Sequence, residues 1–143
     1  MDKNVTTIVL QTPGEVNYLH RIRDFITGIA TESGIDEQDI DNIELAVDEA
    51  CTNVIEHGYD PEATDKSITI RMEIDASKLV LTIIDQGKSF DPRLVQSPDL
   101  NHLIDMKRDG GLGINLIKRT MDTIDYRTTS DGYNELVLTK YLQ

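Results

Sequence analysis

The sequence predicts an α+β fold: a two-layer sandwich in which a mixed, mostly antiparallel sheet carries three helices on one face. Some segments alternate apolar and polar residues, as strands do, and others repeat apolar residues every three or four positions, as amphipathic helices do. Helices and hairpins also come in runs, in the order β-α-α-β-β-loop-α-β-β, rather than in strand–helix–strand alternation. Because the chain has 143 residues, we expect a single domain over 1–143.

The first strand is expected at residues 5–10, with the first helix directly after it. The segment Thr12-Pro13-Gly14-Glu15 combines a Thr N-cap, a Pro at the first helical position and a Glu at the capping-box position. Ser33-Gly34 is expected to end this helix. The apolar stripe of the helix consists of Val16, Leu19, Ile22, Ile26 and Ile29.

The second helix is expected to begin at Asp36, its N-cap, and to run to His57, with Gly58 ending it. Acidic residues near its start suit the positive end of the helix dipole. Glu49 and Asn53 are four residues apart, so they share a face that differs from the core face. The core face carries Ile40, Ile43, Val47, Ala50 and Val54.

Two strands are expected next, at 67–74 and 78–84, joined by the short turn 75–77. The first alternates without fault, which indicates one buried and one wet face, and the second alternates less cleanly, as a more central strand does. From Asp85 to Gly110 no regular period follows. A loop of this length inside a compact domain is usually a functional lid or a disordered segment.

A third helix and two last strands complete the expected fold. The segment Gly110-Gly111-Leu112-Gly113 opens the helix, which runs from 114 to about 121. Strands at 123–129 and 134–141 follow, and Asp131-Gly132 between them is a good hairpin turn.

The net charge of −12 is unevenly spread. Residues 24–65 contain 13 acidic residues and no Lys or Arg, whereas acids and bases cancel in 86–111. An acidic body argues against binding of nucleic acid or an anionic membrane. No run approaches 18 apolar residues, and the sole cysteine, Cys51, allows no intrachain disulfide, so a cytoplasmic protein is expected. Because Cys51 lies beside the core stripe, we expect a buried small hydrophobe rather than a nucleophile.

Three elements are candidates for chemistry, and each has an ordinary alternative. The Asn53 carboxamide could be a partial ligand for Mg²⁺ and the Glu49 carboxylate a proton acceptor, or the two could form an exposed polar pair. Asp85, at the end of an apolar strand, could accept a hydrogen bond from an exocyclic amine, with Gly87 letting a flat ring approach, or the segment could be a common turn. The glycines at 110–113 could expose helix N–H groups to an anion, or form a hinge.

Taken together and in this order, the three elements resemble the GHKL (Bergerat-fold) ATPase superfamily. Within it the chain looks most like the RsbW-type anti-sigma factor serine/threonine kinases, over nearly its whole length from the second helix onward. Residues 49–53 with His57-Gly58-Tyr59 match that family's N-box, residues 85–91 match its first glycine box, and residues 110–122 match its second.

The resemblance implies a role for each matched residue. Glu49 would be the general base, Asn53 would hold Mg²⁺ against the phosphates of ATP, and Asp85 would read the adenine amino group with Gly87 beneath the ring. Gly111, Leu112 and Gly113 would donate backbone hydrogen bonds to the phosphates. Residues 92–110 would be the ATP lid.

The chain also departs from the family pattern. Ser89 stands where the wider superfamily has the second Gly of the first box, a Gly that RsbW-type members often lack too. Tyr133-Asn134 replaces the Gly-Thr that commonly starts the final strand, which puts a nucleotide contact from Asn134 in doubt. No basic clamp is defined; the candidates are Lys88, Arg93, Lys107 and Arg108.

The leading hypothesis is an Mg-ATP-dependent protein serine/threonine kinase that regulates transcription in a partner switch. It would sequester a sigma factor and phosphorylate an anti-anti-sigma protein of the STAS type. By family analogy a homodimer is also expected. One alternative is a nucleotide-gated protein-binding module without significant phosphotransfer. Another is the catalytic domain of a histidine kinase, which would need a helical phosphoacceptor region. The last is a plain acidic globular domain.

Overall fold

The computed structural model describes residues 4–60, 62, 66–88 and 111–142, and it confirms the predicted α+β sandwich. Five strands form one sheet in the order β1-β2-β3-β5-β4. Their bounds are Thr6–Pro13 for β1, Ser67–Ile74 for β2, Lys78–Asp85 for β3, Thr123–Thr128 for β4 and Asn134–Tyr141 for β5. Where the prediction allowed a mixed sheet, the four pairings of these strands are all antiparallel.

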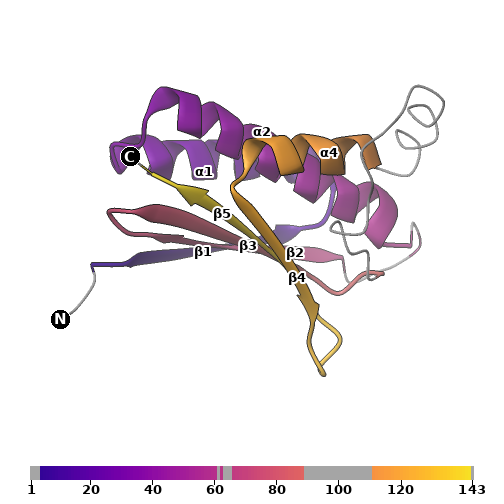
Figure 1. Ribbon diagram of the computed structural model, residues 1–143. Helices are drawn as coiled ribbons and strands as arrows, with labels where there is room; N and C mark the ends of the chain where they lie inside the picture. Colours follow the sequence, from indigo (N-terminus) through magenta and orange to yellow (C-terminus); the bar gives the residue numbers. More distant parts are fainter. Residues whose placement is uncertain (1–3, 61, 63–65, 89–110, 143) are drawn as a thin grey trace.

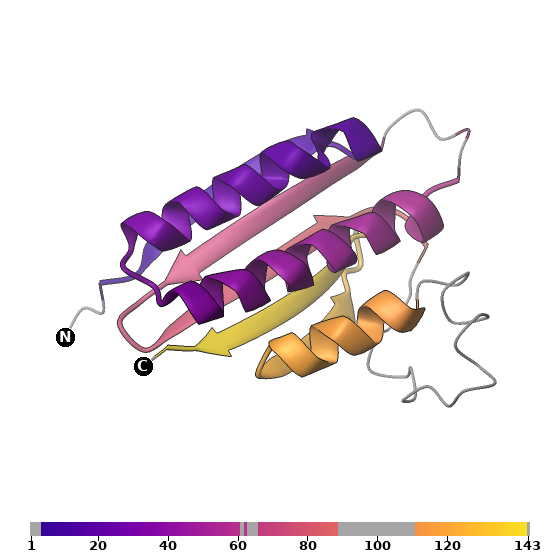
Figure 2. The ribbon, with the colours of Figure 1, turned by 90° about the horizontal axis from the view of Figure 1, so that it is seen from above.

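The helices lie together on one face of this sheet (Figure 1). They are α1 (Leu19–Glu32), α2 (Glu37–Asn53) and α4 (Gly111–Thr120). Seen from above, α2 lies between the other two (Figure 2), and it packs against both. Within the described ranges no helix is long and apolar enough to cross a membrane.

The core forms where the helices meet the sheet, because alternate strand residues point toward them. In β2 and β3 the alternate side chains are buried, and they pack against the apolar stripes of α1 and α2. Cys51 is fully buried in this core, as predicted, and burial raises the pKa of its thiol to about 12. The fully buried large side chains are Ile22, Ile26, Ile43, Val47, Ile68, Ile70, Met72, Leu79, Leu81, Ile83, Ile117 and Leu138.

The predicted start of the first helix is wrong. Thr12 and Pro13 belong to β1, where they pair with Ile68 and Ser67 of β2. The Thr12 hydroxyl donates to the carbonyl of Pro13 rather than capping a helix. Strand pairing over the full length of β2 outweighs a local capping signal worth about 1 kcal/mol, and Pro is tolerated on an edge strand such as β1. The helical path begins with the 3₁₀ turn η1 (Val16–Tyr18), so Val16 is exposed instead of joining the core stripe.

The other predicted boundaries agree closely with the structure. The second helix ends at Gly58 as predicted, but its last turn is the wider π-helical turn η2 (Val54–Gly58). The third helix already includes Gly111, Leu112 and Gly113 instead of starting after them. The final strand spans Asn134–Tyr141 as predicted. The predicted lid, 92–110, lies outside the described residues.

Candidate functional site

The predicted site residues lie at one end of the molecule. The C-terminal end of α2 and the N-terminal end of α4 are found there in both ribbon views (Figures 1 and 2). The last residue of β3, Asp85, is paired in the sheet with the first residue of β5, Asn134. The Lys88 backbone N–H donates to the Gly58 carbonyl oxygen at 2.7 Å, which places the segment after β3 against the end of α2.

The Asp85 carboxyl group is buried, with 8% of the residue exposed. Its Oδ1 atom accepts two hydrogen bonds, one from the Gly87 backbone N–H at 2.8 Å and one from the Asn134 Nδ2 at 2.9 Å. Burial raises the pKa of Asp85, and the two hydrogen bonds oppose that shift. No described residue donates to Oδ2. The carboxyl group is therefore held through one oxygen while the other can accept a hydrogen bond from a ligand.

Gly87 is required by a close backbone approach. A Cβ atom added there would lie 2.4 Å from the carbonyl oxygen of Gly58 and 2.7 Å from its carbonyl carbon. The sequence suggested that this glycine makes room for a flat ring. The structure gives it a separate reason, since only a glycine lets the Asp85 segment lie against the end of α2.

Tyr59 ties the same two segments together. Its hydroxyl donates to the Ser67 carbonyl oxygen at 2.7 Å and accepts from the Gln86 backbone N–H at 2.9 Å. From the sequence, Tyr59 has no role in the site and Gly58 only ends the helix, although both lie in the matched N-box. Neither role could be read from the chain, because both depend on which loop lies opposite the end of α2.

Glu49 and Asn53 lie one turn apart near the end of α2, and both are half-buried. Burial, and then the negative charges of Asp48 and Glu56, raise the pKa of Glu49. In the part of the chain that the structure describes, no cation pairs with Glu49. The Nδ2 atom of Asn53 is buried and has no hydrogen-bond partner. A raised pKa makes a carboxylate a better proton acceptor, and an unpartnered buried amide is uncommon outside functional sites.

The first turn of α4 contains Gly111, Leu112 and Gly113. The first N–H groups of a helix have no partner within the helix, and they carry the positive end of its dipole. No acidic residue lies in this turn, whereas Lys118 and Arg119 lie in the last one. The start of α4 therefore suits an anion such as phosphate.

This set of residues fits a magnesium-bound nucleotide. The free oxygen of Asp85 can accept from a base amine, the first turn of α4 can donate to phosphate oxygens, and the Asn53 carboxamide can offer an oxygen to a cation. Among the described residues, no group of three or more His, Cys, Asp or Glu side chains could hold a metal ion. A cation here would be bound by Asn53 together with phosphate oxygens and water, as Mg²⁺ often is.

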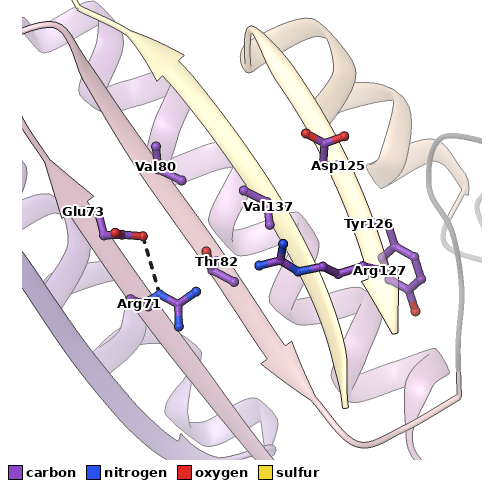
Figure 3. A pocket seen from close by; sticks show the side chains of 8 residues that line it. All are labelled: Arg71, Glu73, Val80, Thr82, Asp125, Tyr126, Arg127 and Val137. Atoms are coloured by element: carbon purple, nitrogen blue, oxygen red, sulfur yellow. Dashed lines mark ion pairs between the residues drawn. The ribbon is translucent and has the colours of Figure 1, made fainter. Parts of the chain in front are cut away.

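A shallow hollow of about 310 Å³ on the opposite face of the sheet contains none of these residues (Figure 3). Its charges are largely matched within the protein: Arg71 pairs with Glu73, and Arg127 pairs with Glu135. It is lined by Arg71, Glu73, Val80, Thr82, Asp125, Tyr126, Arg127 and Val137.

Comparison with solved structures supports the fold. The RsbU and RsbW domains of Rv1364c from Mycobacterium tuberculosis match 96% of this chain with a TM-score of 0.69 at 17% identity, over 32% of that longer chain. The SiaB–SiaC complex from Pseudomonas aeruginosa matches 94% of this chain and 89% of its own, with a TM-score of 0.61 at 12% identity.

Comparison of sequences shows the family. Residues 12–140 match the model of the histidine kinase-like ATPase domain. The serine-protein kinase RsbW of Bacillus velezensis is 32% identical over 99% of this chain and 89% of its own length. The RsbW of Staphylococcus aureus is 33% identical over 95% of this chain and 87% of its own length. The chain therefore belongs to the histidine kinase-like ATPase family and, within it, to the relatives of the serine-protein kinase RsbW.

Proposed function

We propose that this protein is an ATP-dependent protein serine/threonine kinase that acts as an anti-sigma regulatory factor. It would phosphorylate an anti-anti-sigma protein of the STAS type and sequester a sigma factor. The observation that carries the proposal is a pair of side chains on α2. The Glu49 carboxyl group has a raised pKa and pairs with no cation among the described residues, and one helical turn away the buried amide nitrogen of Asn53 has no hydrogen-bond partner among them. The full-length similarity to serine-protein kinases gives the pair its reaction class.

Each residue of the site has a part in the proposed reaction. Asp85 accepts from the adenine amine, and the N–H groups at the start of α4 donate to the phosphates. Asn53 would hold Mg²⁺, which would neutralise phosphate charge. Glu49 accepts the proton of the acceptor hydroxyl while that oxygen bonds to the γ-phosphorus. The bond from this phosphorus to the β,γ-bridging oxygen breaks, and ADP leaves. The protein supplies mainly position and charge, so a small set of residues suffices.

The partners rest on the relatives. The similar kinases are named RsbW, and one solved structure of the same fold is a complex of two proteins. With the proposed activity we therefore assign two partners, a sigma factor and its antagonist, which would compete in a partner switch. We also assign a homodimeric state to the kinase.

The test is transfer of the γ-phosphoryl group to a cognate STAS protein in the presence of Mg-ATP. The Glu49→Gln variant is expected to bind ATP like the wild type but to transfer at least about 100-fold more slowly, because general base catalysis contributes about that much or more. Glu44→Gln is the matched control, since it removes the same charge from α2 more than one turn away from Glu49.

Equal transfer rates for Glu49→Gln and wild type would show that Glu49 is not the base. ATP binding by the wild type without transfer to any STAS protein would instead support a nucleotide-gated binding module.

A further inference from the structure

We infer that Asn134 selects the nucleobase: by occupying one oxygen of Asp85, it limits that carboxylate to a single acceptor, which suits adenine and excludes the two-point binding of guanine. The inference rests on the proposed nucleotide site and extends it to a residue at the start of β5 that the sequence alone does not assign to that site. Asn134 is 3% exposed, and it faces Asp85 across the β3–β5 pairing.

The contacts of Asn134 hold the carboxyl group in one orientation. One N–H of its Nδ2 atom donates to Asp85 Oδ1 at 2.9 Å, and the same nitrogen donates to the Gly87 carbonyl oxygen at 2.8 Å. The Gly87 backbone N–H donates to the same Oδ1 at 2.8 Å. A carboxylate oxygen has two lone-pair directions, so Oδ1 is fully occupied by these two donors. Because both donors meet the same oxygen, rotation of the carboxyl group about its last torsion would break both hydrogen bonds.

A carboxylate on its own does not select adenine. Adenine offers one amine next to a ring acceptor, so it needs one carboxylate oxygen. Guanine offers a ring N–H and an exocyclic amine side by side, and a carboxylate with both oxygens free can accept from both. Because Asn134 and Gly87 occupy Oδ1, only Oδ2 of Asp85 is left for a base. The bidentate arrangement that would favour guanine is therefore closed to this site.

The residue at the start of β5 determines how the Asp85 carboxyl group is held. The resemblance described above would place a Gly-Thr pair here, and this chain has Tyr133-Asn134. A threonine hydroxyl can donate one hydrogen bond to the carboxylate, whereas the amide nitrogen of Asn134 donates to both the carboxylate and the backbone of Gly87. Asn134 is a positioning residue, because it acts on the base through Asp85.

The experiment measures equilibrium binding of ATP, GTP and ITP by calorimetry, without any partner protein. The base of ITP has the ring N–H of guanine but lacks its exocyclic amine, so it cannot bind through two points. The leucine in Asn134→Leu has a similar shape to asparagine but no hydrogen-bond donor. Asn134→Val and Asn134→Thr form a matched pair, because threonine has a hydroxyl where valine has a methyl group. Thr139→Val, a substitution farther along β5, is the matched control.

We expect the wild type and Asn134→Thr to prefer ATP strongly over GTP. In Asn134→Leu and Asn134→Val the preference for ATP over GTP should fall by about tenfold or more, the effect of one charge-assisted hydrogen bond. Binding of GTP relative to ITP should rise in the same variants. If Asn134→Leu does not fold, the Val and Thr variants decide the question.

An unchanged ratio of ATP to GTP affinity in the folded variants lacking a donor would overturn the inference, as would an equal gain for GTP and ITP. Either result would leave the proposed function intact, because wild type would still bind ATP. Failure of the wild type to bind ATP would overturn both.

Discussion

Replacing Gly87 by alanine tests the contact that joins the base-reading segment to the end of α2. The added Cβ atom would lie 2.4 Å from the Gly58 carbonyl oxygen, and ordinary contact begins at 3.4 Å, so one backbone segment must move by about 1 Å. Overpacking of this kind costs about 1–3 kcal/mol. The movement would also weaken the hydrogen bond from the Lys88 N–H to the same oxygen, which contributes about 1 kcal/mol. We expect a loss of about 2–4 kcal/mol in the free energy of unfolding.

Urea unfolding, followed by circular dichroism, measures this loss, and calorimetry measures the weaker ATP binding that should accompany it. Gly28→Ala is the matched control, because a Cβ atom at that exposed position in α1 would meet nothing within 4 Å. It should stabilise the protein by about 1 kcal/mol, as Gly→Ala does in a helix interior. If Gly87→Ala were as stable as the wild type and bound ATP equally well, the close approach of Gly87 and Gly58 would not be a constraint on this fold.

Two further substitutions separate stability from binding. Asp85→Asn should abolish ATP binding, since an amide NH₂ group would face the adenine amine, yet leave the protein as stable as wild type or more so at pH 7. The pKa of Asp85 is raised in the folded state, so the contribution of this residue to the free energy of unfolding falls as pH rises above about 4, the ordinary pKa of Asp in an unfolded chain. The greater stability of Asp85→Asn in urea unfolding should therefore disappear below that pH. A stability advantage that grew in acid would contradict the burial argument. Asn53→Ala should change the free energy of unfolding little, because it removes a buried nitrogen that has no hydrogen-bond partner among the described residues. In calorimetry it should remove the effect of Mg²⁺ on ATP affinity. Retention of that effect would exclude Asn53 as the Mg²⁺ ligand.

Periodicity was enough to predict most of the fold. The alternation in 67–74 predicted β2 with both its ends, and the apolar face of 40–54 predicted the position of α2 over the core. Both patterns arise from burial on one side of a regular element, which a single chain records directly. The start of the first helix was wrong because Thr12 and Pro13 carry a local capping signal, whereas pairing with β2 is a contact between distant segments.

The candidate site could be predicted only in part for the same reason. Glu49, Asn53 and Asp85 each lie in a short motif, and the fold brings their elements to one end of the molecule. The roles of Asn134 and Tyr59 became visible only through their partners, which are 49 and 27 residues away in the chain. Roles that arise from strand register and from the packing of two loops have no local signature in the sequence.

The buried position of Cys51 has a practical consequence for experiments on this protein. It is the sole cysteine of the chain, it is fully buried, and the high pKa of its thiol keeps the reactive thiolate scarce at neutral pH. A cysteine introduced on the surface can thus be labelled with a fluorophore or spin label while Cys51 stays unmodified. Conversely, slow modification of Cys51 in the wild type reports how often the packing between α2 and the sheet opens, which makes the native chain its own probe of local unfolding.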